Sequence, residues 1–132
     1  MSDFPFPLTA LVTLLALGVY HWTFNMVGIA RTRLKVPAPS TDGHPDFARY
    51  YRVQMNTVEQ LVIFVPALWL FALTVSDMWA AIIGAVWPMG RVVYALSYYK
   101  AAEKRGLGFV IGFLSTVALL IGAAVGVVMQ MI

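Results

Sequence analysis

The sequence predicts an all-α integral membrane protein built as a bundle of four transmembrane helices. Composition is the first reason: of 132 residues, 61% are hydrophobic and 11% are charged, whereas soluble domains carry about 25% charged residues. The second reason is that the charges leave four apolar segments long enough to cross a bilayer. We therefore expect one membrane domain, residues 1–132, with spans at about 8–31, 47–76, 78–103 and 107–131.

The first two spans are separated by a polar loop. Residues 8–30 contain no charge, and about 20 apolar residues suffice to cross the hydrocarbon core. No Lys or Arg precedes them, which is unlike a cleaved signal peptide, so we expect this span to be retained. Residues 36–45 are rich in proline, which excludes a helix interior. Asp46 is expected to cap the second helix, which runs to about Ser76.

The third span follows a turn at Asp77 and contains a single charge, Arg91. The fourth span, residues 107–132, carries no charge and contains the motif Gly-x-x-x-Gly twice, beginning at Gly108 and at Gly122. Small residues at this spacing let helices approach closely. We expect these glycines to pack helices within one subunit, and a contact between subunits is the alternative.

The basic residues indicate how the chain lies in the membrane. All nine Lys and Arg lie in or beside the loops that follow the first and third spans. By the positive-inside rule, both loops face the cytoplasm and both termini face outward. The net charge of +3 therefore reflects topology, and no nucleic-acid partner is expected. We expect a bacterial inner membrane as the location, with the endoplasmic reticulum membrane as the alternative.

Two polar stripes lie at the cytoplasmic ends of the second and third spans. The first stripe covers an arc of about 80° at helical periodicity and comprises Arg49, Arg52, Asn56 and Glu59. The second covers about 60° and comprises Arg91, Tyr94, Tyr98 and Arg105. Polar groups inside a span are costly unless they face protein or a ligand. The stripes are therefore candidate walls of a binding site.

The side chains of the stripes suit a small zwitterion with more than one carboxylate. Arginine binds carboxylates in a bidentate manner, and Glu59 could bind an ammonium group. The structural alternative is that Glu59 pairs with Arg52 or Arg91 to hold two helices together. The chain has no cysteine and only two histidines, far apart in sequence, so no metal site is expected.

A family resemblance rests on several segments of the chain: Ala30-Arg31, the proline-rich loop, Phe47 to Glu59, Leu68-Trp69, and Gly90 to Tyr94 with Tyr98 and Arg105. With these segments the chain resembles the MAPEG family, membrane-associated proteins in eicosanoid and glutathione metabolism. The resemblance extends over the whole chain and is greatest to the branch of leukotriene C4 synthase and microsomal glutathione transferases 2 and 3. It implies a homotrimer of four-helix bundles, with glutathione bound between adjacent subunits toward the cytoplasmic side.

The resemblance also implies roles for individual residues. Arg105 matches an arginine that stabilises the glutathione thiolate, because a nearby cation lowers the pKa of a thiol. Thr32 and Gln60 replace an arginine and a tyrosine of leukotriene C4 synthase, which leaves the lipid substrate open. The residues matching glutathione-binding positions are Arg31, Arg52, Gln54, Asn56, Glu59, Arg91, Tyr94 and Tyr98.

The expected function is that of a glutathione-dependent membrane enzyme, a transferase or a peroxidase. Glutathione is the co-substrate, and a hydrophobic small molecule or lipid enters from the bilayer as the second substrate. One alternative is a non-catalytic lipid-binding or scaffold member of the family, and a more distant one is a small four-span exporter. The sequence leaves open the identity of the electrophile and the choice among transfer, peroxide reduction and isomerisation.

Overall fold

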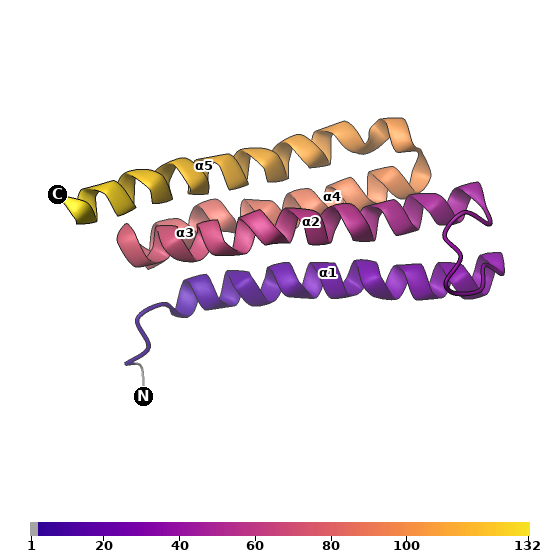
Figure 1. Ribbon diagram of the computed structural model, residues 1–132, viewed down its shortest axis with the longest axis horizontal. Coiled ribbons are helices and arrows are strands. Elements are labelled where there is room, and N and C mark those ends of the chain that lie inside the picture. The colour runs from indigo at the N-terminus through magenta and orange to yellow at the C-terminus, as the bar shows by residue number, and fades with distance from the viewer. Residues whose placement is uncertain (1–2) are drawn as a thin grey trace.

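The computed structural model describes residues 3–132 as a bundle of long helices that run side by side (Figure 1). Four segments of the described chain are long and apolar enough to cross a membrane, with α3 and α4 together forming the third. The all-α, four-span fold expected from the sequence is thereby confirmed. The elements are α1 (Pro7–Leu34), α2 (Pro45–Thr74), α3 (Asp77–Gly84), α4 (Val86–Lys100), the 3₁₀ helix η1 (Ala102–Arg105) and α5 (Gly106–Met131).

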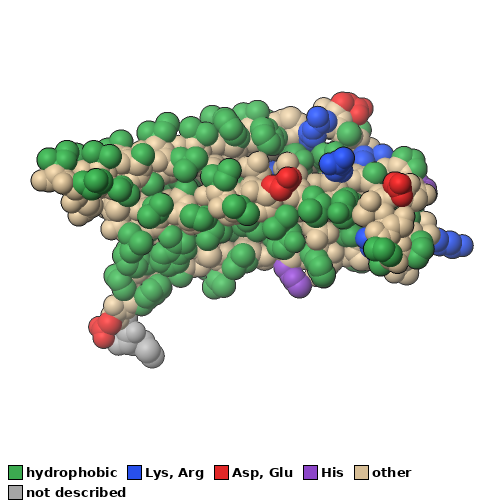
Figure 2. Space-filling view, in the orientation of Figure 1, with side chains coloured by type: hydrophobic (Ala, Val, Ile, Leu, Met, Phe, Trp, Pro, Cys, Tyr) green, Lys and Arg blue, Asp and Glu red, His purple; other side chains and the backbone are tan. Residues whose placement is uncertain are grey.

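Side chains on the surface are distributed as a bilayer requires. Figure 2 shows hydrophobic side chains along the length of the bundle and Lys and Arg gathered toward one end. At that end lie the loop between α1 and α2 and the turn between α4 and α5, while both chain termini lie at the other (Figure 1). An apolar surface with basic loops at one end is typical of an integral membrane protein.

The third span is divided at Ala85. Pro88 has no backbone N–H to donate to the carbonyl of Gly84, four residues earlier, which favours a break in the helix there. The span also ends sooner than the expected residue 103, because Ala101 is extended, with φ −162° and ψ 134°. The chain then forms the short η1 before α5 begins. Because α4 ends early, Arg105 lies in η1 and not on a continuation of α4.

The start of α2 is capped by His44, whose Nδ1 accepts a hydrogen bond from the backbone N–H of Asp46 at 3.0 Å. The prediction that Asp46 itself caps the helix was wrong. Pro45 occupies the first helical position, where a missing N–H costs nothing, and this moves the cap to the residue before it. The carboxylate of Asp46 instead pairs with Arg49 at 2.6 Å.

Asp77 closes the end of the bundle that lies far from the basic loops. Its carboxylate accepts hydrogen bonds from the backbone N–H groups of Leu8 and Thr9, at 3.2 and 2.8 Å. The hydroxyl of Thr9 donates to it as well, at 2.7 Å. The first N–H groups of a helix have no partner within the helix, so one side chain at the start of α3 satisfies the start of α1.

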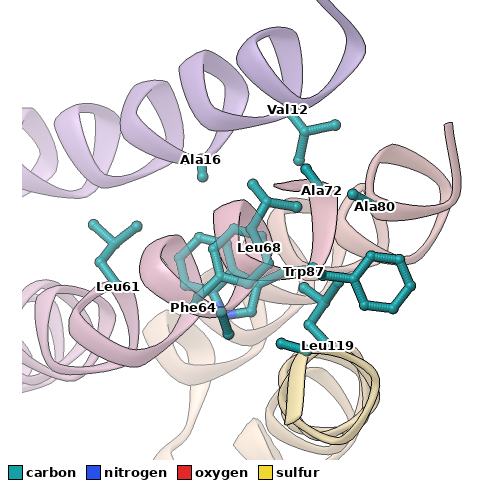
Figure 3. Packing of buried hydrophobic residues seen from close by; sticks show 12 residues of the cluster. Val12, Ala16, Leu61, Phe64, Leu68, Ala72, Ala80, Trp87 and Leu119 are labelled. Atoms are coloured by element: carbon teal, nitrogen blue, oxygen red, sulfur yellow. The ribbon is translucent and has the colours of Figure 1, made fainter. Parts of the chain in front are cut away.

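The core lies where the helices converge and is filled by large apolar side chains (Figure 3). Phe64 of α2 stacks on Trp87 of α4 with 4.5 Å between ring centroids, and Leu68 and Leu119 complete the centre of the cluster. This packing fixes α2, α4 and α5 relative to one another.

Close approach of α5 to α4 and to α2 depends on glycine. A Cβ atom on Gly108 would clash with the backbone N and Cα atoms of Tyr94, and one on Gly122 would clash with the ring of Phe71. These contacts lie within one chain, which confirms the expected role of the two Gly-x-x-x-Gly motifs. They also bring the start of α5 against Tyr94, one of the predicted site residues.

Candidate functional site

A cavity of about 500 Å³ lies at the basic end of the bundle, where α2, α4, η1 and α5 meet. Residues of both polar stripes converge on it. Asn56 belongs to the first stripe, and Tyr94 and Arg105 belong to the second. Such a hollow with converging polar groups is the usual form of a small-molecule site. Its lining residues are Asn56, Tyr94, Glu103, Arg105, Gly106 and Phe109.

Arg105 reaches this cavity from η1. Its Nη1 donates to the carbonyl of Ala102 at 2.6 Å, and its Cζ lies 5.7 Å from the ring centroid of Tyr98. The ring of Tyr98 in turn packs edge-on against Tyr94, with 5.5 Å between centroids. Within residues 3–132 no carboxylate forms a salt bridge with Arg105. Its positive charge is therefore held at the cavity and is available to an anion.

Arg91 lies behind the cavity and is only 2% exposed. Its Nη2 donates to Asn56 Oδ1 and to Thr57 Oγ1, both at 2.9 Å. Its Cζ lies 4.0 Å from the ring centroid of Tyr94. Arg91 thus touches two residues of the cavity without lining the cavity itself. Sequence patterns missed Thr57, whose only signal was its position beside Asn56.

Glu59 is exposed on α2. Among the described residues it forms no salt bridge with Arg52 or Arg91. The structural alternative was that Glu59 joins two helices through one of these arginines. The single chain contains no such pair among its described residues. An exposed carboxylate on a membrane span is costly where it faces lipid.

The two arginines at the start of α2 behave differently. Arg49, a member of the first stripe, donates from its Nε to the carbonyl of Tyr99 at 3.1 Å and pairs with Asp46. It therefore fastens α2 to the end of α4. Arg52 is exposed and lines a separate hollow of about 540 Å³ beside the first loop, which Asp42 also lines.

Two further predicted residues, Arg31 and Gln54, lie away from the cavity. The Nη1 of Arg31 donates to the carbonyl of Ser40 at 2.7 Å, and its Cζ lies 4.7 Å from the ring centroid of Phe47. Arg31 thus ties the first loop to α2. Gln54 is directed toward α1, where its Nε2 lies 3.5 Å from the hydroxyl of Tyr20. One chain therefore brings together only part of the predicted set.

Glu103 is a cavity residue that the sequence patterns missed. Helical periodicity continued from α4 would place it off the stripe that contains Arg105. The chain does not continue as one α-helix, however, because Ala101 is extended and η1 follows. The tighter turn brings Glu103 and Arg105 to the same cavity.

Comparisons with known proteins agree on one family. The model of the MAPEG family matches residues 9–125. An uncharacterised protein of Synechocystis sp. is 48% identical over 92% of this chain and 89% of its own length. Microsomal glutathione S-transferase 2 of Bos taurus is 38% identical over 76% of this chain and 69% of its own. Leukotriene C4 synthase of Bos taurus is 34% identical over 74% of this chain and 65% of its own.

Proposed function

Because the chain belongs to the MAPEG family, we propose that it is a membrane enzyme that activates the thiol of glutathione. Its second substrate is an apolar electrophile or a lipid hydroperoxide that enters from the bilayer. The cavity that joins Asn56, Tyr94 and Arg105 from three elements is the observation that carries the proposal. The relatives named microsomal glutathione S-transferase 2 support glutathione as the co-substrate.

Arg105 supplies the chemistry in this proposal. A guanidinium beside a thiol favours the ionised form and lowers its pKa, and the proton leaves to water. The thiolate sulfur then bonds to the electrophilic carbon, and the leaving group departs with its bonding electrons. With a hydroperoxide, the thiolate sulfur bonds to the terminal peroxide oxygen, the O–O bond breaks, and the alkoxide takes a proton to leave as an alcohol. The thiol of a second glutathione then displaces the hydroxyl of the resulting sulfenic acid, so that glutathione disulfide and water form.

We also propose that a neighbouring subunit completes the site. Residues two apart on an α-helix point about 160° away from each other, so Gln54 and Asn56 lie on opposite sides of α2. Asn56 lines the cavity, whereas Gln54 and Arg31 make their contacts near α1 and the first loop. One ligand can meet both groups only if one chain supplies the first and its neighbour supplies the second. A homotrimer with heterologous contacts meets this condition.

Polar side chains on the outer surface of the spans support this assembly. His21 and Asn25 are exposed on α1, and Glu59 is exposed on α2. Each is unfavourable against hydrocarbon but acceptable against protein. With both basic loops in the cytoplasm, as the positive-inside rule indicates, the cavity opens on the cytoplasmic side of a bacterial inner membrane.

The test is the thiolate absorbance of glutathione added to detergent-purified protein. The wild-type protein should give a thiolate signal and conjugate glutathione to a chloro-dinitrobenzene. Arg105→Ala should abolish the signal and slow conjugation about a hundredfold, the usual cost of losing one group that stabilises a developing anion. Lys104→Ala is the matched control, since Lys104 lies in the same turn but does not line the cavity. An inactive wild-type protein, or an Arg105→Ala variant that keeps its signal, contradicts the proposal.

A further inference from the structure

Arg91 is a buried charge without an ionic partner among the described residues. The residue is 2% exposed. The salt bridge found within residues 3–132 joins Arg49 to Asp46 and does not include Arg91. Two neutral oxygens and the face of Tyr94 surround its guanidinium. Charged groups inside membrane spans are costly and are usually retained for function. The contact with Asn56, a cavity residue, shows where such a function would act.

The chemistry of arginine fixes the orientation of Asn56. A guanidinium has only donors, so the atom of Asn56 that faces Arg91 at 2.9 Å is the carbonyl oxygen Oδ1. The amide nitrogen then points the other way and carries two donors. Because Asn56 lines the cavity whereas Arg91 lies behind it, the donors are the part of the amide left for a ligand.

Thr57 holds Arg91 in the position that makes this possible. Its hydroxyl has one hydrogen, which it donates to the carbonyl of Val53 at 2.7 Å. The lone pairs of the same oxygen are thereby left for Arg91, whose Nη2 donates to it at 2.9 Å. Thr57 is fully buried, so this arrangement has no competition from water. Val53, Thr57, Arg91 and Asn56 form one chain of hydrogen bonds from the core of α2 to the cavity.

We propose that Arg91 is a positioning residue, held by Thr57, which fixes Asn56 as a hydrogen-bond donor and so selects an acceptor oxygen of the ligand. That oxygen belongs to a carboxylate or a peptide carbonyl, and an ammonium group is rejected at this point. The inference rests on the proposed function, for which the ligand is glutathione. It assigns Arg91 an indirect role, through Asn56, whereas the family resemblance implies direct binding.

Three variants test the inference. Thr57→Val keeps the shape but removes the acceptor for Arg91, and should raise the dissociation constant of glutathione about fivefold, the effect of one lost hydrogen bond. Thr57→Ser keeps the hydroxyl and should restore the wild-type value. Asn56→Asp keeps an oxygen toward Arg91 but turns a second oxygen toward the cavity. It should weaken glutathione binding by about tenfold or more, because a donor to the ligand has become an acceptor.

The readout separates positioning from folding. In conjugation assays, Thr57→Val should raise the KM for glutathione while kcat and the KM for the electrophile stay unchanged. Thr74→Val is the matched control, because the hydroxyl of Thr74 also donates to its own helix, at 2.7 Å, but at the far end of α2. Wild-type affinity in both Thr57→Val and Asn56→Asp overturns this inference and leaves the proposed function standing. No glutathione binding by the wild-type protein overturns both.

Discussion

Glu103 and Arg105 place opposite charges at one cavity. A carboxylate near a bound thiol disfavours the thiolate, and so it opposes the effect of the arginine. Removing this negative charge in Glu103→Gln should therefore lower the pKa of bound glutathione. Two charges separated by several ångströms of water interact weakly, so we expect the thiolate fraction below that pKa to rise about twofold. A pH titration of the thiolate absorbance measures the change.

The control for Glu103→Gln is a variant with the same change in net charge elsewhere. Asp3→Asn meets this requirement, because Asp3 is exposed and precedes α1, at the end of the bundle far from the cavity. It should leave the titration curve in place. Identical curves for Glu103→Gln and the wild-type protein would show that Glu103 does not act on the thiol.

At the scale of single residues, helical periodicity predicted which side chains share a face of their own helix. It therefore selected Asn56 and Tyr94, which the structure brings to one cavity, whereas Arg105 reaches that cavity from η1, beyond the end of α4. Periodicity carries no information about the partner that a side chain finds on another helix. For this reason the hydrogen bonds that Arg91 donates to Thr57 and that Arg49 donates to a carbonyl of α4 became visible only in three dimensions.

Among the elements, the contact between α4 and α5 depends on Gly108. A Cβ atom there would meet backbone atoms of Tyr94 and the carbonyl of Gly90, which cannot move as a flexible side chain can. Gly108→Ala should therefore separate the two helices and destabilise the fold by about 3 kcal/mol, the upper range for overpacking. Thermal unfolding in detergent measures the loss. The thiolate signal should fall as well, because Tyr94 lines the cavity.

Gly28→Ala should have the opposite effect on stability. Within the chain itself, nothing lies within 4 Å of a Cβ atom at Gly28, and alanine is favoured over glycine in a helix by up to about 1 kcal/mol. The unfolding temperature should stay or rise. Equal stability of Gly108→Ala and the wild-type protein would contradict the close packing of α5 against α4 at Gly108.

The lengths of the elements were predictable to the extent that apolar segments must match the bilayer. The end of α4 was not, because it is set by the extended conformation of Ala101 rather than by a proline or a change in hydrophobicity. That local feature matters for the site. It replaces a continuing α-helix by η1 and turns Glu103 into a neighbour of Arg105 at the cavity.

For the whole molecule, the number of spans follows from composition, whereas the assembly of subunits depends on surfaces that a single chain leaves exposed. The proposed trimer predicts complementation between inactive chains. Arg105→Ala removes the cavity arginine, and Gln54→Ala removes a residue on the opposite side of α2. Each variant alone should be impaired. Coexpressed in equal amounts, they should recover activity, because a site between subunits can take its intact half from each chain.

The expected recovery can be stated in numbers. If every site draws Arg105 from one subunit and Gln54 from the next around a closed ring, random mixing leaves about a quarter of the sites intact. Arg105→Ala mixed with Asn56→Ala is the control, since both residues line the same cavity of one chain and no site then escapes both changes. Arg31→Ala can replace Gln54→Ala as the second partner.

Conjugation activity of tagged, copurified mixtures provides the measurement, with the oligomer mass determined in parallel. A recovery no greater than the control would place the whole site within one chain and contradict the shared-site assembly.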